Sequence, residues 1–170
     1  MGEYREPERE RREREERERR EREDRERRER GERERRERER EEFLRRLRRI
    51  FEEERRSHER FRRHAAGESA DPMLQYLWGS MASDEYRHGQ MLYPYISSPT
   101  PFSVEEAVEN LQFTQADVEE AIQGELMAIA GYAELAAMAC TLEERMMFVN
   151  IIGDEYGHLR LLMTMQRFCR

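Results

Sequence analysis

The chain has 170 residues, of which 42 % are charged, and its net charge is −7 at neutral pH. The acidic balance and the lack of a basic patch argue against a nucleic-acid-binding protein. No apolar run approaches the roughly 20 residues that span a bilayer, and the N-terminus lacks the apolar core of a signal peptide. We therefore expect a cytoplasmic protein that binds neither nucleic acid nor membrane.

The charge is concentrated in residues 1–42, which contain 18 Arg and 19 Asp plus Glu. In this segment a Glu repeatedly precedes an Arg by four residues, an order that stabilises an isolated helix. The pairs are Glu10–Arg14, Glu13–Arg17, Glu18–Arg22, Glu21–Arg25, Glu26–Arg30 and Glu34–Arg38. Without an apolar stripe the segment cannot join a core. Residues 1–42 are therefore predicted to be a low-complexity arm, either a lone helix or disordered, and most simply a solvated extension.

An apolar stripe with helical period begins at Phe43 and continues to Phe61. Glu54 and His58 follow this stripe, and Glu54 is therefore expected to face the core. The Glu54 carboxylate is thus a candidate metal ligand. For His58 two interpretations remain, an additional ligand or a partly exposed, hydrogen-bonded side chain, and the second is favoured.

Local signals predict the ends of the helices. Gly67 ends the first helix, and Asp71 with Pro72 begins a second that stops at Pro94. Capping boxes, in which residues at the N-cap and three positions later hydrogen-bond each other's backbone, predict helix starts at Ser103 and Thr141. Thr114 with Asp117 predicts the start of another long helix. Residues 43–170 are therefore predicted to form two helical hairpins joined by one long crossover that contains a short helix, as in some four-helix bundles.

An internal repeat connects the two hairpins. Asp84-Glu85-Tyr86-Arg87-His88 matches Asp154-Glu155-Tyr156-Gly157-His158 at an offset of 70 residues, and Glu54 matches Glu125 at an offset of 71. Glu and His three residues apart share one helix face, so both can reach one ion. A duplicated hairpin with an inward Glu on its first helix and Glu-x-x-His on its second would bring both sets together.

The donor set suits a pair of iron or manganese ions, because four carboxylates and two imidazoles provide hard oxygen and borderline nitrogen ligands. Two divalent ions would also cancel the charge of four buried carboxylates. Asp84 and Asp154 are expected to accept the outer N–H of an imidazole. The spacing leaves open whether each Asp serves the His of its own helix or of the other. Tyr132 is expected in the same layer, as a hydrogen-bond donor to a ligand or in electron transfer.

These motifs resemble the ferritin-like superfamily of di-iron carboxylate proteins, and rubrerythrin-type domains in particular, over residues 43–170. The resemblance implies an all-α, ferritin-like four-helix bundle. It also implies six metal ligands, with Glu85 and Glu155 as bridges: Glu54, Glu85, His88, Glu125, Glu155 and His158. Full rubrerythrins carry a four-Cys iron domain, for which the two Cys of this chain are too few.

We therefore expect a ferroxidase or a peroxide-reducing enzyme. In it, two iron or two manganese ions would react with dioxygen or hydrogen peroxide. The electron donor is unidentified, and Tyr132 would pass an electron or proton. One alternative is a non-catalytic metal-binding or iron-storage bundle in which the arm serves assembly. Another is a helical protein without metal. Most of the Met and aromatic residues at helical spacing are explained by packing in the core. The remainder would fit a surface through which two copies of the chain form a homodimer.

Overall fold

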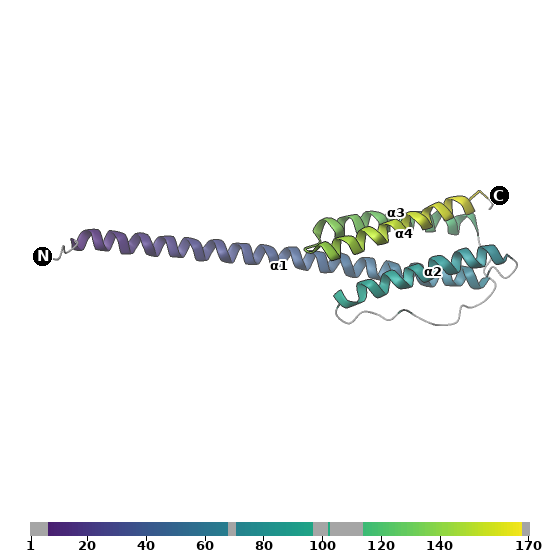
Figure 1. Cartoon of the computed structure of the whole chain (residues 1–170), viewed down its shortest axis with the longest axis horizontal. Coiled ribbons are helices and arrows are strands. Elements are labelled where there is room, and N and C mark those ends of the chain that lie inside the picture. Colours follow the sequence, from purple (N-terminus) through teal and green to yellow (C-terminus); the bar gives the residue numbers. More distant parts are fainter. Residues whose placement is uncertain (1–6, 68–70, 97–101, 103–113, 168–170) are drawn as a thin grey trace. The chain divides into compact units, whose positions relative to one another are not determined.

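The computed structural model describes residues 7–67, 71–96, 102 and 114–167. Every element in these ranges is helical (Figure 1). The elements are α1 (Glu8–Gly67), α2 (Pro72–Leu92), the 3₁₀ turn η1 (Tyr93–Tyr95), α3 (Gln115–Met138) and α4 (Leu142–Met165). The all-helical fold class is thus confirmed. The short helix predicted from Ser103 lies outside the described residues.

The chain divides into two compact units, Met1–Glu42 and Phe43–Arg170. In the first unit the described residues from Glu8 onward are α-helical, and all are exposed except half-buried Glu42. Ion pairs one turn apart occur along this segment. The Arg comes first, opposite to the predicted order, in Arg9–Glu13, Arg11–Glu15, Arg19–Glu23 and Arg35–Glu39, and the Glu comes first in Glu16–Arg20. In so dense a tract Arg19, for example, has acids both four residues before and four residues after it.

Three helix starts were predicted correctly. The Asp71 side chain accepts hydrogen bonds from the backbone N–H groups of Met73 and Leu74, with Pro72 at the first helical position. Thr114 with Asp117, and Thr141 with Glu144, form reciprocal capping boxes. Side-chain acceptors satisfy backbone donors that an α-helix leaves unpaired at its start. The local sequence thus determines where α2, α3 and α4 begin.

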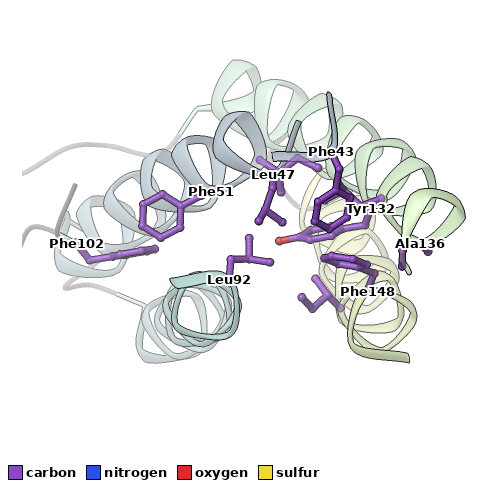
Figure 2. Packing of buried hydrophobic residues seen from close by; sticks show 12 residues of the cluster. Phe43, Leu47, Phe51, Leu92, Phe102, Tyr132, Ala136 and Phe148 are labelled. Carbon is purple, nitrogen blue, oxygen red and sulfur yellow. The ribbon is translucent and has the colours of Figure 1, made fainter. Parts of the chain in front are cut away.

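In the second unit, side chains from all four helices form two separate buried apolar clusters. The first contains Phe43 and Leu47 of α1, Leu92 of α2, Tyr132 of α3 and Phe148 of α4. Figure 2 shows Leu47, Leu92 and Phe148 converging between the helices. The second cluster contains Phe61, Trp78, Val118 and Leu162, among others. Each helix therefore contributes apolar side chains to both clusters, and its residues between them form a middle layer.

An aromatic contact within the first cluster fixes one point of the segment between α2 and α3. Phe102 is buried and packs edge-on against Phe51, with ring centroids 5.6 Å apart, and against Tyr86 at 5.4 Å. Its ring occupies the space above Gly89, where a Cβ atom would overlap it. Gly89 is thus required for this close approach. None of the described helices is long and apolar enough to cross a membrane.

Candidate metal centre

The middle layer between the two clusters contains all six predicted ligands, and every one of them is buried. Glu54 comes from α1, Glu85 and His88 from α2, Glu125 from α3, and Glu155 and His158 from α4. At most 3 % of each residue is exposed. Because four carboxylates from four helices meet where water is excluded, the layer requires compensation by cations or protons.

The six residues form two overlapping groups of possible ligands. One group is Glu54, Glu85, His88 and Glu155, and the other is Glu85, Glu125, Glu155 and His158. Within each group, one ligand atom per residue lies within 4.8 Å of the others. Glu85 and Glu155 belong to both groups, so their carboxylates lie between the other members of the two groups. The buried Glu/His cluster can therefore hold metal.

The Nδ1 atoms of both imidazoles face the carboxylates. His88 Nδ1 lies 3.0 Å from Glu155 Oε1 and 3.3 Å from Glu54 Oε2. His158 Nδ1 lies 3.2 Å from Glu85 Oε1 and 3.3 Å from Glu155 Oε2. It is also 3.7 Å from an oxygen of Glu125. Each imidazole nitrogen is therefore close enough to share an ion with the neighbouring oxygens.

The pattern of unpaired polar atoms fits a metal. Among the described residues, both Nδ1 atoms and four carboxylate oxygens of the layer are buried without a hydrogen bond of acceptable geometry. They are His88 Nδ1, His158 Nδ1, Glu54 Oε2, Glu85 Oε1, Glu155 Oε1 and Glu155 Oε2. A buried polar atom without a partner costs about 1–3 kcal/mol. Since all six atoms belong to predicted ligands, cations in the layer would satisfy them together.

Protonation can replace metal in the layer. Burial opposes the charging of His88, but Glu155 and Glu54 outweigh it and raise the His88 pKa to about 10. Burial also opposes the charging of His158, yet its three carboxylate neighbours raise its pKa far above the ordinary value. Burial raises the pKa of Glu125 to about 8. In the metal-free protein at neutral pH, these groups therefore hold protons.

The two shared carboxylates have opposite pKa shifts. Burial, together with the charges of Glu54 and Glu155, raises the pKa of Glu85 well above its ordinary value. Burial acts in the same direction on Glu155, but the neighbouring imidazoles of His158 and His88 outweigh it and lower the Glu155 pKa. Without metal, the surroundings thus favour the charged form of Glu155 and the protonated form of Glu85.

The outer edges of the imidazoles pair across the hairpins. His158 Nε2 lies 3.2 Å from Asp84 Oδ2, and His88 Nε2 lies 3.4 Å from Asp154 Oδ2. Each Asp therefore accepts a hydrogen bond from the His of the opposite helix, which settles the alternative that spacing left open. Such a bond fixes the imidazole tautomer that presents Nδ1 to the middle layer.

Arg87 links both pairs and was missed by the sequence analysis. Its guanidinium donates to Asp84 Oδ1 at 2.7 Å and to Asp154 Oδ2 at 3.2 Å. The position three residues after Asp84 on the same helix was a usable signal. The other repeat has Gly157 at the matching position, so a single Arg serves both aspartates.

Tyr132 is fully buried, and its hydroxyl donates a hydrogen bond to Glu54 Oε1. This contact matches one of the two roles expected for Tyr132. Burial, followed by the charge of Glu54, raises the pKa of the phenol well above its ordinary value. The phenol therefore remains a donor and orients Glu54, whose second oxygen faces His88.

His58 belongs to neither group of possible ligands. Its Nδ1 lies 2.8 Å from the backbone oxygen of Ala82, and its ring packs against Phe102. The expectation of a hydrogen-bonded His58 is confirmed. The expected partial exposure was wrong, because Phe102 and Tyr86 cover the ring and only 8 % of the residue is exposed.

The chain was also compared with known proteins. No family model matches the chain, and neither does any curated protein.

Proposed function

We propose that residues 43–170 form a ferritin-like bundle of two duplicated hairpins, joined by one crossover, that binds two metal ions. One observation carries the proposal: the two groups of possible ligands share Glu85 and Glu155. A single-ion site would need no second Glu-x-x-His, and two separate sites would need no shared carboxylate. Asp84 and Asp154, each paired with the His of the opposite hairpin, support the same two-fold arrangement.

The donor set favours iron or manganese as the bound ions, since carboxylates predominate and only two imidazoles are present. Zinc is commonly satisfied by four ligands in a tetrahedral site, and is therefore less suited to this set. Two iron(II) or manganese(II) ions would supply electrons for the reduction of dioxygen or hydrogen peroxide. Ferroxidase or peroxide-reducing activity is the function that these residues support best.

The residues of the chain would divide the remaining tasks. Glu85 and Glu155 would bridge, and a bridging carboxylate can change its binding mode when the charge beside it changes. Asp84 and Asp154 hold the imidazoles in one tautomer, while Tyr132 keeps Glu54 in place. The apolar clusters on both sides exclude water, which strengthens electrostatic interactions within the layer.

A second candidate function is metal storage or structural metal binding without turnover. The burial of the layer favours it, because Glu155 and His88 are 0 % exposed and a reactant would need the helices to move. In this case metal would still be bound, but oxidation of the bound ions would be slow or absent.

The test begins with metal binding by the whole chain under anaerobic conditions. We expect about two Fe(II) ions per chain, the number that two overlapping ligand groups accommodate. Glu155→Ala combined with His158→Ala should abolish this binding, whereas Asn150→Ala, at an exposed position of α4, should leave it unchanged. Absence of binding by the wild type, or its retention by the double variant, would contradict the proposal.

Oxidation is then measured on the loaded protein. Addition of dioxygen or hydrogen peroxide should oxidise the bound Fe(II) faster than it oxidises the same concentration of free Fe(II). Tight binding of two ions without this acceleration would favour storage or structural metal over an oxidoreductase. Metal analysis of protein purified without chelators would separate iron from manganese.

A further inference from the structure

The outward face of α4 carries a row of exposed apolar side chains. Helix α4 buries Phe148, Ile151, Glu155, His158 and Leu162. Its opposite side carries five large apolar residues, each with an exposed fraction between 47 % and 73 %. They are Leu142, Met146, Val149, Tyr156 and Met163. Exposed apolar rows of this length mark interaction surfaces more often than isolated exposed residues do.

The spacing of this row is that of a coiled-coil seam. Leu142, Val149, Tyr156 and Met163 follow one another at intervals of seven residues. Met146, Gly153 and Arg160 lie four residues after the first three of them. Two alternating positions repeated every seven residues form the seam along which one α-helix packs against another. The occupant that this row fits is therefore a helix with a row of the same period.

The arm of the chain cannot be that helix. Residues 8–42 consist of Arg, Glu, Asp24 and Gly31 and have no apolar side chain to insert between those of α4. A second α4, by contrast, presents the matching row. Identical surfaces that meet across a two-fold axis satisfy one another, as in most dimers of identical chains.

The charges of the row determine the direction of pairing. Exposed Glu143 flanks its N-terminal end, and exposed Arg160 lies near its C-terminal end. In an antiparallel pair whose two-fold axis crosses the helices at the level of Ile151, Arg160 of one copy lies beside Leu142 and Glu143 of the other. It also places Arg145 opposite the uncharged Gly157 of the other copy. Parallel packing would instead bring Arg160 to Arg160.

We propose that two copies of this chain associate through α4, packed antiparallel across a two-fold axis. Gly153 lies near the middle of the row and has open space where a Cβ would be, so two backbones can approach there. Gly153, Arg160 and Met163 also line a surface groove that reaches Asp84 and His158. The α4 of the second copy would cover this groove. The association requires no metal in the buried layer.

The first test is the oligomeric state of the whole chain, measured by sedimentation with and without a charge in the row. The wild type should be a dimer at micromolar concentration. Val149→Glu places a carboxylate in the seam twice per dimer and should weaken association by about a hundredfold or more. Met73→Glu, at a residue of α2 that is 65 % exposed, is the matched control and should remain dimeric.

The second test is a charge exchange that depends on the antiparallel direction. Arg160→Glu should weaken the dimer by about tenfold, since it faces Glu143 of the other copy. Glu143→Arg combined with Arg160→Glu should restore it. Circular dichroism of each variant verifies that the helices are retained. A monomeric wild type, a Val149→Glu dimer as stable as the wild type, or a charge exchange without recovery would each overturn the proposal.

Discussion

Without metal, the stability of this protein should fall as the pH rises from 5 to 8. Burial raises the pKa of Glu125 to about 8, and carboxylate neighbours raise that of His88 to about 10 against the opposing effect of burial. Between the ordinary and the raised pKa of each group, the folded protein binds more protons than the unfolded chain. The free energy of unfolding therefore decreases with pH over that interval.

The magnitude follows from the size of the shifts, because one pKa unit corresponds to about 1.4 kcal/mol. Glu125 alone should remove about 3 kcal/mol of stability between pH 5 and pH 8. His88 should remove about 2 kcal/mol between pH 6.5 and pH 8. Glu155 has a lowered pKa, so its contribution is fully present above its ordinary pKa and is lost only at lower pH. It therefore does not reverse the slope in this window.

The assay is urea unfolding at several pH values after removal of metal by a chelator. Trp78 is the single Trp and is fully buried, so its fluorescence follows the four-helix unit and not the arm. Glu125→Gln removes one titrating group and should flatten the slope, whereas exposed Glu119→Gln should not. Manganese(II) should stabilise the protein more at pH 8 than at pH 5, because ligands must lose protons to bind. Metal-free stability that is constant or increases from pH 5 to pH 8 would refute this reasoning.

Three substitutions and one control substitution test other contacts of the site and fold. Arg87→Gln frees both aspartates and should weaken metal binding by about 10- to 100-fold, as measured by competition with a chelator. Tyr132→Phe leaves the buried Glu54 carboxylate without this donor and should lower metal-free stability by about 1–3 kcal/mol. Gly89→Ala displaces the ring of Phe102 and should destabilise by about 1–3 kcal/mol. Gly79→Ala, on the same helix with open space around it, should instead stabilise by up to about 1 kcal/mol.

Each of these expectations has a contrary result. Arg87→Gln with unchanged metal affinity would mean that the His–Asp pairs do not need the guanidinium. An unchanged urea midpoint for Tyr132→Phe would mean that its hydroxyl does not stabilise the buried layer. Equal effects of alanine at Gly89 and Gly79 would indicate that Phe102 does not occupy the space above α2.

Much of the helical unit could be predicted from local sequence. Asp71, Thr114 and Thr141 begin helices because their side chains bond to backbone groups within three residues, an interaction that needs no other part of the chain. The seventy-residue repeat and the apolar stripe through Glu54 likewise selected the residues of the middle layer. Helical spacing determines which residues share a face, and hence which ones can meet.

The arm and His58 show the limits of such reasoning. The acids and bases of residues 8–42 offer each Arg several partners one turn away, so the composition does not specify which pairs form. His58 was expected to be partly exposed, but Phe102, which is 44 residues away in sequence, packs against its ring. A cover that comes from a distant segment leaves no periodic signal in the helix that it covers.

What the sequence alone determined is the identity of the six buried donors, because each faces inward by the period of its own helix. Only the tertiary structure decided how they are shared and held. It makes Glu85 and Glu155 common to both groups, pairs each Asp with the His of the opposite helix, and places Arg87 between the two aspartates. These contacts depend on the rotation and distance of one helix relative to another, which are set by side-chain packing across the whole core and not by spacing along one helix.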